Sequence, residues 1–487
     1  MNMKMTIIME KKIDKIEGFD GKALHPALDI KDSVLVIGFR YRAISGKIED
    51  LILVVRNGSI EHFTDSGFSF LEDEKTYFVE KAHRLLVEIS ERWSLDDLNR
   101  FREEYQNPTL NGVPEGNALY GEIRNVLKRY VELEQEIDYS LITAWIIGTY
   151  FFPAFSAYPF LNAKAPKRSG KSQFLDLLTQ LCFNATKARP TLAALGDTVE
   201  SSRGTFLIDQ ADSLGGQNNE ELLEHLTGSY KKNGSKRKLI SLDKGKRNQL
   251  EFETYCPKVF ASIKELPEDL RDRCLIVPLI RSGKNFSDPN DDNPLWLALR
   301  SKLYRFLFGN YADVANEYFL RRAMYKQSNE ITGRHLELWL PFETLLRQCH
   351  VGEEEISAGK NRFISQYKFT ESELGELDEA IIGVVLKKLD NEEKITLSPK
   401  EILEDLDNEQ FSDSKTDRQK AGLVGAAIRR MNLSSERKRT KKGITYLFEK
   451  KKVERVYAAY FPTSPTPDVV TLENTDEKGG VSISVEL

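Results

Sequence analysis

Hydrophobic and polar residues alternate in two runs near the start of the chain, SVLVIGFRYRAI and DLILVVRNGSI. Such alternation is typical of strands with one buried face, and Ser45-Gly46-Lys47 between the runs predicts a turn. A charged amphipathic stretch from Lys81 to Tyr105 then predicts a helix. Residues 1–110 are therefore expected to form a small α/β domain, and they contain no recognisable site.

The middle of the chain alternates short apolar runs with helical segments. The runs AYPFLNA, TFLIDQ, PKVFASI and RCLIVPLI are separated by segments such as FLDLLTQLCF and NEELLEHL. This order is typical of a parallel sheet with helices on its faces. Turn-rich residues 107–117 predict a linker, so a second α/β domain is expected over residues 118–350.

One segment of the middle region, Leu141 to Leu161, contains no charged residue and is long enough on paper to span a bilayer. Its glycine, prolines and polar residues interrupt any single helix, and it leads directly into a polar loop. We therefore predict a buried helix at about Tyr139–Phe151, a buried strand at Tyr158–Ala163 and a chain without a membrane span.

The last third of the chain starts with the acidic segment 352–409. Apolar spacing predicts helices at 377–389 and 417–431, and Ser398-Pro399-Lys400-Glu401 predicts the capped start of another. Two basic strands, at 436–439 and 444–448, should follow. Three helices and a hairpin in this order indicate a winged-helix domain at 370–455, and the Pro/Ser/Thr-rich tail at 456–487 is expected to be disordered.

Composition narrows the functional classes. The 487 residues carry 70 Lys and Arg against 75 Asp and Glu, a net charge of −5, which excludes a uniformly basic nucleic-acid coat. The four cysteines form no CxxC pair and the six histidines no metal-ligand spacing. This cysteine usage fits the reducing cytoplasm.

The clearest chemical motif ends in Gly-Lys-Ser. A phosphate loop binds phosphates through backbone N–H groups and a lysine, and its Ser or Thr hydroxyl binds Mg²⁺. A buried strand before the motif and an amphipathic helix after it match this mechanism, although alanine stands where the full pattern has its first glycine. The predicted ATP-binding loop consists of Ala165, Pro166, Lys167, Arg168, Ser169, Gly170, Lys171 and Ser172.

A second strand, TFLID, ends in Asp209, which together with Ser172 is the predicted Mg²⁺ ligand pair. The next residue is Gln210, where a glutamate normally polarises the attacking water. Glutamine can orient a water molecule but cannot accept its proton, and loss of a general base costs about 10²–10⁴-fold in rate. Asp212 is an alternative candidate for this role, and nucleotide binding is the firmer expectation than fast hydrolysis.

The order of these motifs resembles the AAA+ replicative helicases of plasmids, phages and genomic islands, which are related to minichromosome maintenance and phage primase–helicase ATPases. The resemblance covers about residues 139–285. It implies a polar γ-phosphate sensor, Ser262 or Lys264, and an arginine finger that reaches the ATP of a neighbouring subunit, Arg273 or Arg271. A finger acting in trans implies a ring, most simply a homo-hexamer. Arg281 is a further sensor candidate.

Two basic stretches are candidate DNA-binding surfaces, because lysines and arginines neutralise phosphates and release counterions. The first is a predicted hairpin. In the helicases that the chain resembles, a hairpin at the corresponding place projects into the central channel. The second is the recognition helix and wing of the predicted winged helix. The candidates are Lys236, Arg237, Lys238, Lys244, Lys246 and Arg247 in the hairpin, and Arg429, Arg430, Lys441 and Lys442 in the winged helix.

Taken together, these patterns predict a cytoplasmic AAA+ ATPase that encircles single-stranded or forked DNA and couples hydrolysis of ATP, with Mg²⁺, to translocation or unwinding. Its place in replication would involve further replication proteins as partners. Two alternatives stay open: an ATP-switched DNA-binding initiator or regulator with negligible hydrolysis, and a component whose nucleotide only joins subunits.

Overall fold

The computed structural model divides the chain into two compact units, Met1–Gln366 and Tyr367–Leu487. The expected domains of residues 1–110 and 118–350 both lie within the first unit, and the expected domain of residues 370–455 lies within the second. The structure describes residues 21–107, 112–165, 169–188, 191–216, 219–243, 246–280, 284, 286–290, 294–326, 331–373, 375–390, 392–406, 416–431, 433–440 and 443–460.

The N-terminal region forms two sheets over one apolar core. One sheet is antiparallel with strand order β2-β3-β4-β5, and the other has the order β1-β7-β6. Leu24, Val36, Val54 and Tyr77 come from both sheets and pack in the same cluster. The two predicted runs are confirmed as strands β3 and β4. The strands are β1 (Lys22–Leu24), β2 (Leu28–Lys31), β3 (Val34–Arg42), β4 (Ile48–Arg56), β5 (Ser59–Phe63), β6 (Phe68–Glu72) and β7 (Lys75–Val79).

The helix predicted from Lys81 was wrong in its first half, because α1 spans only Leu95–Gln106. Ser94 caps it, its hydroxyl accepting a hydrogen bond from the Asp97 N–H at 3.4 Å. The residues before the cap serve β3 instead: the Arg40 N–H donates to the Val87 carbonyl at 2.9 Å. Long-range pairing therefore outweighs the local helical pattern there. A short 3-10 helix, η1 (Ile89–Glu91), completes the segment.

The centre of the first unit is a five-stranded sheet with the order β14-β8-β13-β10-β9. All neighbouring strands are parallel, which confirms the predicted parallel sheet. The first of these strands along the chain, β8, lies between the fourth and the fifth, and such a switch in strand order opens a crevice at the carboxyl ends of the strands. The strands are β8 (Phe160–Lys164), β9 (Thr186–Lys187), β10 (Phe206–Ile208), β13 (Lys258–Ser262) and β14 (Cys274–Pro278).

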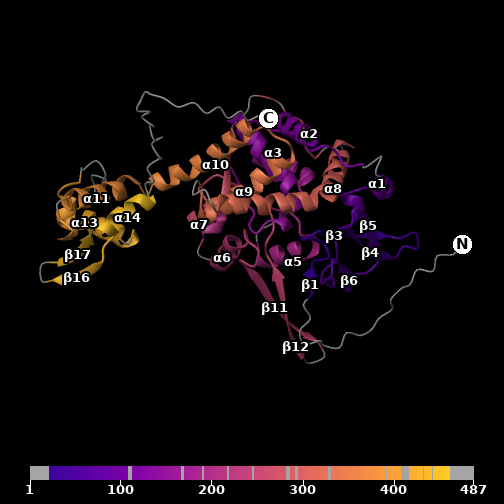
Figure 1. Ribbon diagram of the computed structural model, residues 1–487, viewed down its shortest axis with the longest axis horizontal. Helices are drawn as coiled ribbons and strands as arrows, with labels where there is room; N and C mark the ends of the chain where they lie inside the picture. Colours follow the sequence, from indigo (N-terminus) through magenta and orange to yellow (C-terminus); the bar gives the residue numbers. More distant parts are fainter. Residues whose placement is uncertain are drawn as a thin grey trace, which may run out of the picture. The chain divides into compact units, whose positions relative to one another are not determined.

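Helices make up much of the rest of the first unit (Figure 1). Helix α3 is buried on every side from Asp138 to Phe151, as an apolar helix without a polar face must be. The predicted buried helix and strand are thus confirmed, and no helix among the described residues is both long and apolar enough to cross a membrane. The helices are α2 (Gly116–Tyr130), α3 (Glu136–Phe151), η2 (Phe152–Ala154), α4 (Lys171–Leu181), α5 (Leu192–Ser202), η3 (Ala211–Gly215), α6 (Glu220–Gly228), α7 (Glu268–Arg271), α8 (Pro294–Tyr325), α9 (Gly333–Gln348) and α10 (Glu353–Glu373).

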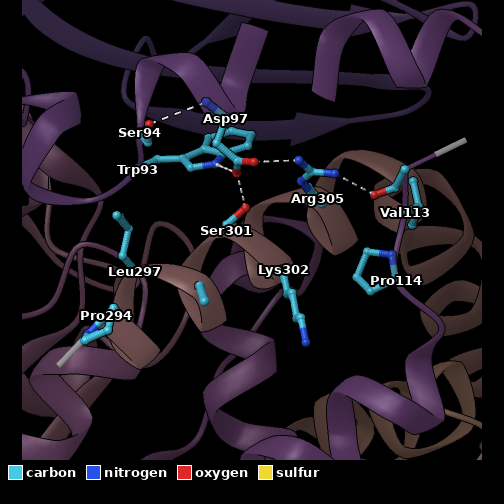
Figure 2. A pocket seen from close by; sticks show the side chains of 12 residues that line it. Trp93, Ser94, Asp97, Val113, Pro114, Pro294, Leu297, Ser301, Lys302 and Arg305 are labelled. Carbon is cyan, nitrogen blue, oxygen red and sulfur yellow. Dashed lines mark hydrogen bonds and ion pairs between the residues drawn. The ribbon is translucent and has the colours of Figure 1, made fainter. Parts of the chain in front are cut away.

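The N-terminal region joins the rest of the unit at α8. Arg305 of α8 donates to Asp97 of α1 at 2.6 Å and to Glu104 at 2.6 Å. Trp93 donates to the same Asp97 carboxylate at 2.7 Å, beside a cavity of about 500 Å³ (Figure 2). The Tyr311 hydroxyl donates to the Ser33 carbonyl at 2.8 Å. These partly buried bonds hold the two regions together.

A hairpin extends from the first unit between α6 and β13 (Figure 1). Its strands, β11 (Lys236–Asp243) and β12 (Lys246–Glu253), are antiparallel, with Lys236 opposite Glu253 and Asp243 opposite Lys246. The predicted hairpin is confirmed.

The second unit has a three-stranded antiparallel sheet with the order β15-β17-β16. Three helices precede the β16–β17 hairpin, as predicted, and Ser398 and Glu401 form the predicted capping box. Strand β15 and the last helix were missed, and that helix continues beyond residue 456; residues 461–487 lie outside the described residues. The elements are α11 (Gly375–Lys388), β15 (Lys394–Leu397), α12 (Pro399–Leu403), α13 (Asp417–Arg430), β16 (Glu436–Thr440), β17 (Gly443–Glu449) and α14 (Lys450–Tyr460).

Candidate nucleotide-binding site

The predicted phosphate loop joins β8 to α4 at the carboxyl edge of the parallel sheet. Gly170 is the N-cap of α4 with φ of 77° and gives the helix no side-chain cap. A left-handed residue at this position favours glycine, and the first N–H groups of the helix are left for another acceptor. The end of α4 can therefore bind an anion. Pro166, Lys167 and Arg168 lie outside the described residues.

The backbone at Ala165 explains why the loop does not need the first glycine of the full pattern. Its N–H donates to the Ser262 carbonyl at 3.1 Å, so the loop entry continues the pairing of β8 with β13. An extended residue needs no positive φ, and alanine is accommodated there.

Lys171 crosses the loop from the first turn of α4. Its ammonium group donates to the Ala165 carbonyl at 2.7 Å. Partial burial lowers the pKa of this amine, although the charges of Asp212 and Asp209 act in the opposite direction. The predicted lysine and both carboxylates are thus near one another. Ser172, the next helical residue, is exposed.

Asp209 and Gln210 follow the buried strand β10. The Asp209 carboxylate accepts a hydrogen bond from the Gln210 N–H at 2.9 Å. Gln210 is exposed and has φ of 57° and ψ of 45°, a left-handed conformation that costs a residue with a side chain about 1 kcal/mol or more. The chain therefore turns sharply after β10, between Asp209, the predicted metal ligand, and Gln210, the predicted water-orienting residue.

Asp212 links two strand ends. Its Oδ1 accepts hydrogen bonds from the N–H groups of Ile263, at 2.9 Å, and Lys264, at 2.6 Å. These bonds hold η3, which follows β10, to the end of β13. Asp212 therefore has a structural task beside the role considered for it as a base.

The two γ-phosphate sensor candidates differ in their surroundings. Ser262 is fully buried, and its hydroxyl donates to Asn162 Oδ1 of β8 at 3.0 Å. Lys264 is exposed beyond the end of β13. Asn162, which the sequence reasoning missed, is buried, and its Nδ2 has no hydrogen-bond partner within the described part of the chain. A single asparagine inside the apolar run AYPFLNA was the available signal.

A small cavity lies against the loop on the other side. It has a volume of about 150 Å³, and its walls include Ser169 and the apolar side chains of Tyr130, Leu279 and Phe286. Ser169 is 6% exposed and its hydroxyl has no hydrogen-bond partner among the described residues. An orphaned buried hydroxyl beside a cavity is a group that a ligand can satisfy.

The two finger candidates are engaged within their own chain. Arg273 is 8% exposed, its guanidinium lies 5.2 Å from the centre of the Tyr230 ring, and it donates to the Asp269 carbonyl. Burial lowers the pKa of this guanidinium. Arg271 lies 3.5 Å from Glu265, which also pairs with Lys164. A role in a neighbouring subunit remains a prediction and requires Arg273 to leave these contacts. Arg281 lies outside the described residues.

The basic hairpin presents lysines on one face. Lys236 and Lys238 lie 3.9 and 3.3 Å from Glu251 of the opposite strand. Both lysines are exposed. Lys244 lies outside the described residues, as do the side chains of Arg237, Lys246 and Arg247.

In the second unit, Arg429 donates to the Tyr446 hydroxyl at 3.2 Å, which ties α13 to β17. The side chain of Arg430 and all of Lys441 and Lys442 lie outside the described residues. The described part of this predicted surface is therefore the α13 end around Arg429.

Comparisons with known proteins give little further guidance. No protein-family model matches the chain, and no curated protein matches it. Among solved structures, the apo C-terminal region of NrS-1 is 10% identical and covers 85% of this chain and 96% of that one, with a TM-score of 0.30. A full-length MCM homolog from Methanopyrus kandleri is 10% identical over 68% of this chain and 76% of its own, with a TM-score of 0.31.

An inhibitor-bound JCV helicase is 13% identical over 50% of this chain and 70% of its own, with a TM-score of 0.25. TM-scores of this size are too low to assign a fold or a function. The chain's own geometry is the stronger guide.

Proposed function

We propose that this chain is an AAA+ ATP hydrolase that moves along or unwinds DNA as a ring, most simply a homo-hexamer, in the replication of a mobile genetic element. The observation that carries the proposal is the uncapped start of α4, where the Lys171 ammonium crosses the loop to the Ala165 carbonyl and the charges of Asp209 and Asp212 act on the pKa of that amine. Ligands of parallel sheets bind at the carboxyl ends of the strands, where the strand order switches.

The residues at this edge fit ATP with Mg²⁺. The N–H groups of the first turn of α4 and the Lys171 ammonium would bind the β- and γ-phosphates, and Ser172 and Asp209 would hold the metal. The orphaned Ser169 hydroxyl, beside a small cavity of about 150 Å³, would offer one further polar contact at the edge of the site. When bound, Mg-ATP supplies the phosphoanhydride bond whose hydrolysis drives the motor.

Each remaining residue has a task in this scheme. Gln210 orients a water molecule without accepting its proton, and Asp212 keeps the β10 and β13 ends in register. Lys264, at the exposed end of β13, is the better-placed candidate to sense the γ-phosphate, since the Ser262 hydroxyl is directed to Asn162. Arg273, or Arg271, would serve the neighbouring subunit.

DNA would be held by two surfaces. The hairpin lysines Lys236 and Lys238 are exposed and would bind the phosphate backbone. The second unit has the element order of a winged helix and would make the second contact through α13 and the turn between β16 and β17.

A second function is favoured by one observation, the glutamine at position 210. A chain that binds ATP but hydrolyses it negligibly would act as an ATP-switched DNA-binding initiator or regulator.

Steady-state phosphate release by the purified full-length chain, with and without single-stranded DNA, separates the two proposals. DNA-stimulated turnover that is absent from Lys171→Ala supports the motor, and forked-DNA unwinding completes the test. ATP-dependent DNA binding with no turnover supports the switch, whereas measurable turnover that is equal in Lys171→Ala and the wild type would refute both.

A further inference from the structure

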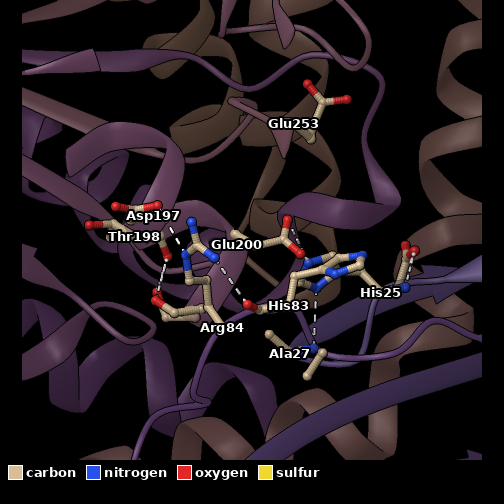
Figure 3. A network of polar contacts seen from close by, with 12 residues as sticks. His25, Ala27, His83, Arg84, Asp197, Thr198, Glu200 and Glu253 are labelled. Atoms are coloured by element: carbon tan, nitrogen blue, oxygen red, sulfur yellow. Dashed lines mark hydrogen bonds and ion pairs between the residues drawn. The ribbon is translucent and has the colours of Figure 1, made fainter. Parts of the chain in front are cut away.

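One arginine of the N-terminal region reaches the root of the hairpin. Arg84 follows β7 and its Nε lies 3.2 Å from Asp197 Oδ1 on α5 (Figure 3). The same guanidinium lies 5.2 Å from the centre of the Phe252 ring on β12. Phe252 is 1% exposed. Arg84 therefore joins three segments that are far apart in the sequence: the N-terminal region, α5 and the hairpin.

A second contact fixes α5 to the same region. His25 Nε2 lies 3.5 Å from Glu200 Oε2, one turn beyond Asp197, and both side chains are buried. The Ala27 N–H donates to His25 Nδ1 at 3.2 Å, which places the ring proton of a neutral His25 on Nε2, toward Glu200. Helix α5 is thus held at two successive turns.

The rest of the hairpin root faces a cavity of about 340 Å³. Its walls are charged, with Asp29 and Glu80 on the N-terminal side, Arg203 after α5, and Lys236 and Glu251 on the hairpin. A polar cavity of this size has room for water molecules. The N-terminal region meets the hairpin at Phe252, which lies beside Arg84 and whose ring centre is 6.2 Å from that of His83.

We infer that the N-terminal region anchors the hairpin, and that Arg84 is the positioning residue that does so by clamping Phe252 against α5. That this hairpin grips DNA rests on the proposed function; the anchoring itself does not. Arg84 touches neither the nucleotide site nor the exposed face of Lys236 and Lys238. Its loss loosens the hairpin root while the phosphate loop keeps its own contacts.

The test uses the full-length protein and hydrogen exchange of peptides that cover residues 236–253. Arg84→Ala removes the ion pair and the cation–π interaction, and Phe252→Leu removes the ring while keeping an apolar side chain. Each variant should speed exchange at the strand ends by about three- to tenfold. The double variant should add little to either single change, because both disrupt the same pair of side chains.

Two controls separate anchoring from general damage. Arg84→Lys keeps a cation near the ring and the carboxylate, and its exchange should stay within about twofold of the wild type. Arg42→Ala removes an arginine of the same region that donates locally, to the Gly46 carbonyl, and should leave the hairpin unchanged. Hairpin exchange that is unaltered in both Arg84→Ala and Phe252→Leu would overturn the inference.

A functional readout follows from the same variants. Arg84→Ala should keep basal phosphate release and lose most of the stimulation by single-stranded DNA. If stimulation survives while exchange rises, the anchor stands and the hairpin is not what couples DNA to turnover. If the wild type neither binds DNA nor turns over, the proposed function fails, and the exchange experiment still decides the anchor.

Discussion

Replacing Asp212 with asparagine or alanine separates a structural role from a catalytic one. One oxygen of the carboxylate accepts hydrogen bonds from the backbone N–H groups of Ile263 and Lys264. Asparagine keeps a carbonyl oxygen that can accept the same bonds but cannot act as a base, whereas alanine removes the acceptor altogether. The two substitutions therefore have different consequences for the two roles.

The size of the effect follows from the geometry. A hydrogen bond to a charged group contributes about 1.5–3 kcal/mol when buried. Ile263 is 41% exposed, and water can replace part of what is removed. We therefore expect Asp212→Ala to cost about 1–2 kcal/mol at this edge and Asp212→Asn about half as much. Because we assign Asp212 a structural role, turnover of Asp212→Asn should fall by less than about tenfold. Loss of a general base would instead cost about 10²–10⁴-fold in rate.

Two measurements check this prediction. Hydrogen exchange of a peptide covering residues 258–266 reports the two N–H groups, and phosphate release at saturating Mg-ATP reports turnover. Glu221→Gln, an exposed acid at the start of α6, is the matched control. If Asp212→Asn kept the protection of both N–H groups but lost turnover by a hundredfold or more, Asp212 would be a base and its structural role would not explain its presence.

Three further results are expected. Burial depresses the folded-state pKa of Lys171, so its contribution to stability is present above the unfolded pKa and is lost as the pH falls through the folded pKa. The unliganded wild type should therefore lose stability relative to Lys171→Met as the pH falls toward neutrality. Chemical denaturation at several pH values measures this difference, and equal pH profiles of the two proteins would contradict it. Asp138→Asn should lower the unfolding free energy by about 1.5–3 kcal/mol in urea titrations, because it removes the buried negative charge 2.9 Å from Arg362 and leaves that guanidinium with the Ile276 carbonyl as its charge-free partner. Reversing the charges of Lys236 and Lys238 should weaken single-stranded DNA binding and reduce its salt slope by about 1.4, at about 0.7 for each phosphate that is no longer neutralised; an unchanged slope would exclude these lysines from the interface.

Much of the fold could be predicted where the signal is local. The apolar residues that form α3 and β8 can only be accommodated in the interior of the protein. The Ser398 and Glu401 capping pattern indicates a helix start through its own hydrogen bonds. The hairpin strands and the three helices and hairpin of the second unit follow from short-range patterning in the same way, whereas β15 and α14 did not.

The rest depends on contacts between distant segments. Residues 85–88 lie in the stretch predicted as a helix, but the Arg40 N–H pairs with the Val87 carbonyl and no helix forms there. Likewise, the burial of Arg273 against Tyr230 joins residues 43 positions apart, and no local pattern reports it. At the site, the motifs predicted Lys171 and Asp209, whereas the pairing of Ser262 with Asn162 needed the strand order.

Titration of the intact protein with Mg-ATP in a calorimeter tests the nucleotide site most directly. We expect saturable binding heat with about one nucleotide per chain, and an affinity reduced at least tenfold by Lys171→Ala, which removes the ammonium group at the start of α4. Lys187→Ala, outside the loop and paired with Asp176 at 3.1 Å, should bind as the wild type does. No heat from the folded wild type, or equal affinity in Lys171→Ala, would contradict a nucleotide site at this edge of the sheet.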